Sequence, residues 1–310
     1  MMHKVILLTD PGIDGAFATA LALYDPDIDV LGLAATAGNV SADQATTNVQ
    51  ILVEQFDPPR WPRLGAALPV NYEIDGQRLH GPGGLGGVSF PSAQLHHQHS
   101  SDKLLIDLVR MHPREITLVV LGPLTAVARA FDRDPELPGM IQRLICVGGS
   151  WHEPGNATAV AEFHFYCDPI SARQVLRSGV PLTLIPLDVT RKLVFSPSDL
   201  LELPNPESRA CRFLRKIVPY GIRMTSNLYG VEGFYLKDVL GVVAVSLPNV
   251  LSVKPMRVDV ETRGELTRGM SVVDARPEQR TKPNVDVGVG VDVAAVRAYI
   301  QRVLGESPEH

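Results

Sequence analysis

The sequence has few cysteines and no excess of positive charge. Only three of its 310 residues are cysteines, Cys146, Cys167 and Cys211, and their spacing matches no metal-binding motif. Such a set is typical of reduced, buried thiols in a cytoplasmic protein. The formal net charge is −5. This argues against a nucleic-acid partner, because binding to nucleic acid requires a basic face.

Long apolar segments are also missing. No apolar run reaches the length of a transmembrane helix, and the opening residues MMHKVILLTD lack the long apolar region of a signal peptide. We therefore expect no membrane partner. Hydrophobic residues make up 45% and charged residues 20% of the chain, a balance typical of a folded globular protein. Because no repeat or linker-like stretch interrupts the chain, we expect residues 1–310 to form a single domain.

Two motifs lack the context that their chemistry requires. Gly81-Pro-Gly-Gly-Leu-Gly86 fits the dinucleotide pattern G-x-G-x-x-G, but it follows no strand and opens no helix. There is therefore no helix N-terminus at which these glycines could help to bind a phosphate. The cluster His96-His97-Gln98-His99 lies in a polar stretch, and we interpret it as a solvated loop rather than a metal site.

Strands alternate with helices along much of the chain. The runs 5–8, 29–35, 116–121, 144–147 and 182–186 are typical of buried strands, and a helical pattern follows each. This alternation predicts an α/β fold with an open, mostly parallel, doubly wound, Rossmann-like sheet.

Further elements are predicted with less regular patterns. Residues 57–100 show little periodicity and are expected to form a long irregular segment, whereas 195–236 should be mainly helical. Helices are expected at 238–245 and 291–304, and a strand at 256–261.

Polar groups follow several of the predicted strands. Asp10 and Asp14 come after the first strand, Asn39 follows the second, and Leu121 ends the strand at 116–121. The carboxyl edge of an open α/β sheet is where ligands bind. A purely structural alternative is that Asp14 caps the following helix and Asp10 forms a turn.

Two later stretches add oxygen-rich and charged groups to this set. The segment 156–164 carries Asn156, Glu162 and His164, and Lys237-Asp238 precedes a helix of small residues. Gathered at one edge, such oxygens suit a hard cation such as Ca²⁺ or Mg²⁺ better than zinc. A carboxylate at this site could also take a proton from a bound water.

Several motifs resemble those of the nucleoside hydrolase family, including its inosine–uridine-preferring members. They are TDPGID at 9–14, GN at 38–39, HG at 80–81, LGPLT at 121–125, GGSWHEPGNATAVAEFHFYCDP at 148–169 and YLKDVLGVVAV at 235–245. The motifs occur in the family's order across nearly the whole chain. The resemblance implies the nucleoside hydrolase fold, hydrolysis of ribonucleosides to ribose and free base in nucleobase salvage, one Ca²⁺, and a homodimer or homotetramer.

The resemblance also implies a role for each matched residue. Asp10 would bind calcium and act as the base for the attacking water, with Asp238 and the Leu121 carbonyl as further ligands. The ribose hydroxyls would be held by Asp14, Asn39, Asn156 and Glu162, and His80 would lie near the sugar or base. Binding of this kind stabilises an oxocarbenium-like transition state.

Four positions in the catalytic region depart from the family pattern, and one of them is Leu8, which replaces an Asp that is common in the family's first strand. Gly15 stands where the family has a second calcium-binding Asp, so we expect calcium to bind more weakly or to be replaced by another divalent cation. His164 replaces an Asn that contacts the sugar. Lys237 replaces a His that protonates a purine leaving group, and with a reference pKa of about 10.4 it would need burial to become a good acid.

These departures leave three interpretations open. The protein is a working hydrolase with an altered metal site, a ribosyl-binding homologue without turnover, or an enzyme acting with another metal or on a non-nucleoside glycoside. The loops that would contact the base match nothing specific, and fold resemblance alone does not settle function.

Overall fold

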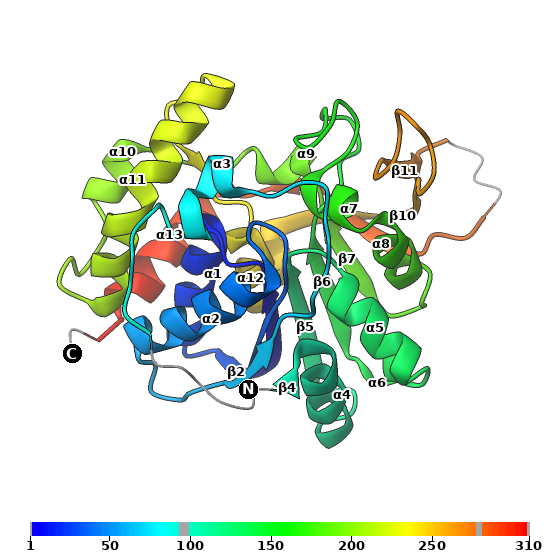
Figure 1. Ribbon diagram of the computed structural model, residues 1–310, viewed down its shortest axis with the longest axis horizontal. Coiled ribbons are helices and arrows are strands. Elements are labelled where there is room, and N and C mark those ends of the chain that lie inside the picture. The colour runs from blue at the N-terminus through cyan, green and yellow to red at the C-terminus, as the bar shows by residue number, and fades with distance from the viewer. Residues whose placement is uncertain (1, 93–98, 277–280, 309–310) are drawn as a thin grey trace.

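A ten-stranded sheet runs through the middle of the molecule, with helices on both faces (Figure 1). The computed structural model describes residues 2–92, 99–276 and 281–308. The strand order is β11-β10-β12-β7-β6-β5-β1-β2-β3-β4, and the pairs from β12 to β4 are parallel, whereas β10 is antiparallel to both of its neighbours. The strands are β1 (His3–Thr9), β2 (Ile28–Ala35), β3 (Arg63–Ala66), β4 (His99–Ser100), β5 (Ile116–Leu121), β6 (Arg143–Val147), β7 (Leu182–Ile185), β10 (Leu251–Val260), β11 (Ser271–Asp274) and β12 (Val285–Val291).

Each face of the sheet is buried in its own hydrophobic core. Along β1, Val5 and Leu7 belong to one core and Ile6 and Leu8 to the other, because successive side chains of a strand point to opposite faces. This double burial explains why the central strands are continuous apolar runs. One core is covered by α1 (Ile13–Tyr24), α2 (Ala42–Phe56), α11 (Arg209–Tyr229), α12 (Val239–Ser246) and α13 (Val293–Gly305). The other is covered mainly by α4 (Ser101–Met111), α5 (Thr125–Arg133) and α8 (Pro169–Leu176).

Short elements connect these layers. They are α3 (Gln77–His80), η1 (Pro82–Gly84), α6 (Leu137–Met140), α7 (Phe163–Cys167), α9 (Leu187–Thr190), α10 (Pro197–Leu201) and η2 (Pro248–Val250), together with a separate antiparallel pair, β8 (Val194–Phe195) and β9 (Phe234–Tyr235).

The predicted α/β class and the predicted mostly parallel sheet are confirmed. Some elements differ from the expectation. The segment 57–100 is not wholly irregular, because it contains β3, α3 and η1 and reaches β4, and β12 at 285–291 was not predicted at all. Glycine interrupts β12 (VDVGVGV) and lowers its strand propensity, so its pattern is weak. The strand expected at 256–261 is longer, starts at Leu251 and runs antiparallel.

Several smaller expectations can also be compared with the fold. The three cysteines are free and buried. The glycines of Gly81–Gly86 follow helix α3 rather than a strand, as the exclusion of a dinucleotide site requires. Of the histidine cluster, His99 lies in β4, whereas His96 and His97 lie outside the described residues.

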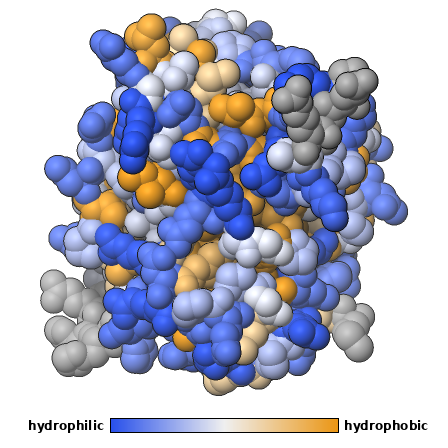
Figure 2. Space-filling model, turned by 90° about the vertical axis from the view of Figure 1, so that its right-hand side faces the viewer, coloured by the Kyte–Doolittle hydropathy of each residue, from blue (hydrophilic) through white to orange (hydrophobic). Residues whose placement is uncertain are grey.

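The surface is mostly hydrophilic on the face seen from the right of Figure 1. Figure 2 shows that hydrophobic side chains on this face gather in several small patches among polar ones. Within the described residues, no helix combines the length and the apolar character needed to cross a membrane.

Candidate active site

The carboxyl ends of β1, β2 and β5 meet at one edge of the sheet. Thr9, the last residue of β1, lies opposite Ala35 in β2 and opposite Leu121 in β5. Asp10 and the turn 36–39 therefore adjoin each other and the end of β5. Sequence order alone separates these groups by up to 111 residues (from 10 to 121), but the parallel register brings them together.

Asp10 is held by the turn after β2. The Asn39 backbone N–H donates to Asp10 Oδ2 over 3.0 Å, and Asn39 Nδ2 donates to the Asp10 carbonyl over 2.8 Å. A Cβ atom at Gly38 would lie 2.1 Å from Asp10 Oδ2, so this position has room only for glycine. Asp10 is fully buried, and its Oδ1 has no hydrogen-bond partner among the described residues.

Asp14 lies in the first turn of α1 without capping it. The helix is capped by Gly12 and has no side-chain cap, so the structural alternative for Asp14 is wrong. Its carboxylate is buried, with Lys237 Nζ at 3.6 Å from Oδ2 and His80 Nδ1 at 3.7 Å from Oδ1.

His80 faces Asp14 as a neutral ring. The backbone N–H of Ile13 donates to His80 Nδ1 over 3.1 Å, so this nitrogen is an acceptor and carries no proton. Burial lowers the pKa of His80 to about 4, although the Asp14 carboxylate opposes the shift. At neutral pH, His80 is therefore a positioned polar group rather than a cation.

Glu162 has a structural role alongside its predicted one. It is the N-cap of α7, and its Oε2 accepts backbone N–H groups from Gly149 (3.0 Å), His164 (2.9 Å) and Phe165 (3.3 Å). His164 Nδ1 lies 3.0 Å from the Val147 carbonyl, and its Nε2 lies 3.6 Å from Asp10 Oδ2. His164 therefore contacts the Asp10 carboxylate, and it does not line the two pockets beside Lys237 that are described below.

The pKa values of the three buried aspartates are shifted in different directions. Burial raises the pKa of Asp10 to about 7. Burial, together with the neighbouring Asp14 carboxylate, raises the pKa of Asp238 well above its usual range. Burial alone would raise the pKa of Asp14 too, but the Lys237 ammonium holds it below its usual range.

Lys237 is buried among these carboxylates and remains charged. Burial disfavours the ammonium, but Asp14 and then Asp238 more than offset this effect and raise the pKa of Lys237 above its usual value. The burial that would make Lys237 a good acid is present, yet the pKa moves in the opposite direction. Lys237 is therefore a fixed positive charge and hydrogen-bond donor at this site.

The donor set fits a hard cation, though sparsely. Buried oxygens without a hydrogen-bond partner gather here: Oδ1 of Asp10, Oδ1 of Asp238, both Asp14 oxygens and the Thr9 hydroxyl. Unpaired buried carboxylates are costly, and a cation would relieve that cost. Among the described residues, however, no group of three or more His, Cys, Asp or Glu side chains is arranged as a metal site. Gly15 lies at this point, where a Cβ would be 3.3 Å from Asp238 Oδ2, but it supplies no oxygen.

Two adjoining pockets open above the carboxylates. The larger has a volume of about 480 Å³, and it reaches Asn39, His80 and Lys237. The smaller, of about 300 Å³, shares Leu79, Asn156, Tyr229 and Lys237 with it and extends to Arg191. Asn39, His80 and Lys237 line the larger pocket, and each also contacts a buried carboxylate. These three residues therefore form the floor of the larger pocket.

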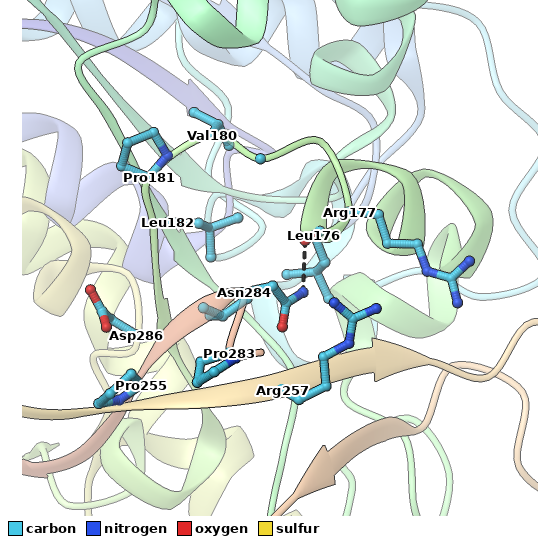
Figure 3. A pocket seen from close by; sticks show the side chains of 12 residues that line it. Leu176, Arg177, Val180, Pro181, Leu182, Pro255, Arg257, Pro283, Asn284 and Asp286 are labelled. Carbon is cyan, nitrogen blue, oxygen red and sulfur yellow. Dashed lines mark hydrogen bonds between the residues drawn. The ribbon is translucent and has the colours of Figure 1, made fainter. Parts of the chain in front are cut away.

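A third groove lies at the opposite edge of the sheet. It has a volume of about 720 Å³ and is lined by the end of α8, the start of β7 and parts of β10 and β12 (Figure 3). At its centre, the Asn284 side-chain amide donates to the carbonyls of Leu176 (2.8 Å) and Val258 (3.0 Å). The fold thus satisfies this amide, and none of the buried, unpaired side-chain atoms found in the described part of the chain belongs to the lining of this groove.

Most of the predicted site residues come together at this edge. Those that gather around the pockets and the buried carboxylates are Asp10, Asp14, Asn39, His80, Leu121, Asn156, Glu162, Lys237 and Asp238. Asn156 Oδ1 accepts the Phe163 N–H over 2.8 Å, so part of its side chain is already engaged.

Sequence reasoning missed several pocket residues. Tyr229 ends α11, and Arg191 directly follows α9; neither belongs to a motif that marks chemistry. The only available signal was their position beside two resembling segments, Tyr235 in the YLKD stretch and Glu153 in the 148–169 stretch.

Comparison with known proteins places the chain among nucleoside-cleaving enzymes. The sequence profile of the family described as inosine-uridine preferring nucleoside hydrolase matches residues 5–298. The chain is 32% identical over 316 residues to the probable uridine nucleosidase 2 of Oryza sativa subsp. japonica, covering 97% of this chain and 93% of that one. It is 33% identical over 309 residues to the non-specific ribonucleoside hydrolase RihC of Escherichia coli, covering 98% and 99%.

Solved structures agree with these sequence relatives. The purine-preferring ribonucleoside hydrolase from Gardnerella vaginalis superposes with a TM-score of 0.90 at 26% identity, over 98% of this chain and 99% of that one. A plant nucleoside hydrolase, the PpNRh1 enzyme, superposes with a TM-score of 0.89 at 27% identity and the same coverage. These similarities support hydrolysis and give no support to a ribosyl-binding homologue without turnover.

Proposed function

The chain belongs to the family of inosine–uridine-preferring nucleoside hydrolases, and we propose how its residues hydrolyse the N-glycosidic bond of ribonucleosides. The reaction adds water across the bond between ribose C1′ and the base nitrogen. The observation that carries the assignment of roles is the buried Asp10 carboxylate, whose Oδ1 is unpaired within the described residues and which is hydrogen-bonded to Asn39 in the lining of the larger pocket. Asp10 accepts the proton of the attacking water as a general base.

The state of Asp10 suits this role. A general base works best when its pKa lies near the working pH, and burial raises the pKa of Asp10 to about 7. The Asn39 backbone N–H donates to Oδ2 of the carboxylate, and the Asn39 side-chain amide donates to the Asp10 backbone carbonyl. These two hydrogen bonds fix Asp10 and leave Oδ1 without a partner in the described part of the chain.

Ribose recognition is assigned to the polar groups around the larger pocket. Asn39, His80 and Asn156 line it, and Asp14 and Glu162 lie beside these residues. His164 was predicted to contact the sugar, but in our proposal it positions Asp10, because its Nε2 faces Asp10 Oδ2. Hydrogen bonds that tighten as positive charge develops on the ribose ring lower the barrier.

A divalent cation, with Ca²⁺ as the first candidate, would be held by Asp10, Asp238 and the Leu121 carbonyl. A cation bound there lowers the pKa of water and helps to orient the ribose hydroxyls. Calcium takes about 6–8 oxygen ligands, and its affinity follows the number of charged ones. Because Gly15 contributes none, we expect weak binding, or replacement of calcium by another divalent cation.

The cellular setting is part of the same proposal. A free ribose and a free base are the products that nucleobase salvage consumes, and the three free cysteines suit a cytoplasmic protein. We further propose a homodimer or homotetramer that acts on small ribonucleosides, with neither nucleic acid nor membrane as partner.

Substitution of the two calcium-site carboxylates tests these roles. Asp10→Asn should lower kcat for uridine by about 10²–10⁴-fold, the range expected for loss of a general base. Asp238→Ala should also lower kcat, because it removes a carboxylate that would hold the cation. Asp286→Asn, in the groove at the far edge of the sheet, is the matched control and should keep wild-type turnover. Full activity in both Asp10→Asn and Asp238→Ala would show that the proposed roles are wrong.

A further inference from the structure

The smaller pocket offers a place for the base that leaves. It adjoins the proposed ribose pocket through four shared residues, so a ribose above Asp10 would direct its base into it. This inference therefore rests on the proposed function. The lining residues are Leu79, Glu153, Asn156, Leu187, Arg191, Tyr229, Tyr235 and Lys237.

The walls of this pocket suit a flat heteroaromatic ring. The rings of Tyr229 and Tyr235 meet edge to face with centroids 6.4 Å apart, and Leu79 and Leu187 add aliphatic surface. A planar base gains most from such walls, because aromatic faces and aliphatic groups cover it without requiring hydrogen bonds.

Two positive charges line the same pocket. One is Lys237, at the junction with the ribose site, and the other is Arg191. The Arg191 Nη1 atom is 2.7 Å from Glu153 Oε2, and Nη2 donates to the Gly155 carbonyl over 3.4 Å. Both partners belong to the loop that carries Asn156, so the guanidinium is fixed relative to the ribose site.

Arg191 keeps unused hydrogen-bond donors. A guanidinium carries five N–H donors and does not give up a proton in proteins, and the contacts described above are the ones it makes within the described part of the chain. The Arg191 side chain is 22% exposed. A base in the pocket can therefore accept hydrogen bonds from the free N–H groups of Arg191, and the existing contacts of Arg191 stay in place.

We propose that the base departs as an anion stabilised by Arg191. In this proposal no acid protonates the base as the bond breaks. When the C1′–N bond breaks, the bonding electron pair leaves with the base nitrogen, and the negative charge spreads onto ring nitrogens and exocyclic oxygens. Arg191 donates hydrogen bonds to those atoms. The water oxygen bonds to C1′, its proton passes to Asp10, and the base anion takes a proton from solvent after departure.

This role is worth most in the transition state. Charge on the base develops only as the bond breaks, so a fixed donor aimed at it lowers the barrier without tightening substrate binding. Loss of Arg191 should therefore reduce kcat more than it raises KM.

Two substrates with different leaving groups test the proposal. Uridine releases a poor leaving group, whereas 4-nitrophenyl β-D-ribofuranoside releases nitrophenolate, which departs without help. Arg191→Gln should lower kcat for uridine by about 100-fold, as loss of one charge-stabilising donor does. For the nitrophenyl riboside we expect a change of less than about threefold. Arg191→Lys, which keeps the charge but not the fork, should lie between the wild type and Arg191→Gln for uridine.

The control variant is Arg257→Gln, an arginine in the distant groove, which should match the wild type on both substrates. Equal loss on uridine and on the nitrophenyl riboside in Arg191→Gln and Arg191→Lys would overturn the inference, because it would show that Arg191 only tethers the loop around Asn156. A wild-type protein that hydrolyses neither substrate would instead overturn the proposed function, and this inference with it.

Discussion

At the level of single residues, the site consists of buried aspartates whose oxygens the fold leaves only partly paired. Asp10, Asp14 and Asp238 are each 0–1% exposed, and each has at least one oxygen without a hydrogen bond. Removing carboxylates from water costs several kcal/mol per ion unless charges of opposite sign compensate. Lys237 supplies one such charge, and in our proposal the substrate hydroxyls and a cation engage the oxygens that remain unpaired.

Gly15 provides a direct test of the cation's place. A side chain there would begin 3.3 Å from Asp238 Oδ2, so Gly15→Asp adds a carboxylate to the site. We expect calcium affinity to rise by about tenfold or more, because affinity follows the number of charged ligands. The new Cβ would lie 2.7 Å from Thr9 Oγ1, so the variant is best made with Thr9→Ala. The measurement is calorimetric titration with Ca²⁺.

The matched control for this variant is Gly15→Asn with Thr9→Ala, which has the same shape but lacks the charge. If the Asp and Asn variants bound calcium equally, the cation would not lie beside Gly15. Stability of both variants is followed by thermal unfolding, so that a loss of fold is distinguished from a loss of binding.

The lowered pKa of His80 should make the free energy of unfolding depend on pH. Burial lowers its pKa from 6.5 to about 4 in the folded protein, so protons bind the unfolded state preferentially between these values. The stabilising contribution is present above pH 6.5 and is lost as pH falls through about 4, at up to about 1.4 kcal/mol per pH unit. His80→Asn should show a shallower loss over this range. Urea unfolding at pH 7, 5.5 and 4.5 measures it, and identical slopes in both proteins would contradict the assignment.

At the scale of elements, the turn after β2 positions the base. The close approach of Gly38 to Asp10 Oδ2 leaves no room for a side chain. Gly38→Ala should therefore displace the Asp10 carboxylate, reduce turnover strongly and cost about 1–3 kcal/mol of stability through overpacking. Gly139→Ala is the control, because a Cβ there meets nothing within 4 Å. Uridine turnover and urea midpoints are compared, and wild-type turnover in Gly38→Ala would contradict this role of the turn.

How far the sequence predicts an element depends on where its stabilising contacts come from. β5 (ITLVVL) is buried on both faces, and its apolar run alone identified it. β3 and β4 have four and two residues, and they are strands because neighbouring strands supply hydrogen bonds. No local pattern marks such a strand.

The same distinction applies to the site. Asp10 and Asn39 could be predicted because Asp10 directly follows β1 and Asn39 lies in the turn after β2, both strands of a parallel sheet. The position of His164 beside Asp10, and the pair Arg191–Glu153 in the base pocket, depend on how loops fold back over the sheet. The direction of the Lys237 pKa shift also depends on the number of carboxylates around it, which only the three-dimensional arrangement specifies.

At the scale of the whole molecule, one sheet joins the two hydrophobic cores. Elements from both ends of the chain pack on the same core, since β1 and α13 both contribute to it. We propose on this ground that residues 1–310 form one domain that unfolds cooperatively. Urea unfolding followed by tryptophan fluorescence, from Trp61 and Trp151, should coincide with the transition in far-ultraviolet circular dichroism. Two separate transitions would contradict a single domain.

The central claim is that this chain uses its strand-end carboxylates to hydrolyse ribonucleosides. The most direct test is the rate at which the wild-type protein, first treated with a chelator, releases ribose and uracil from uridine as Ca²⁺ is added back. Our account predicts equal amounts of ribose and uracil, at a rate that rises with Ca²⁺ and is largely abolished in Asp10→Asn. It would be contradicted if no ribose appeared at any calcium concentration, or if Asp10→Asn released ribose as fast as the wild type.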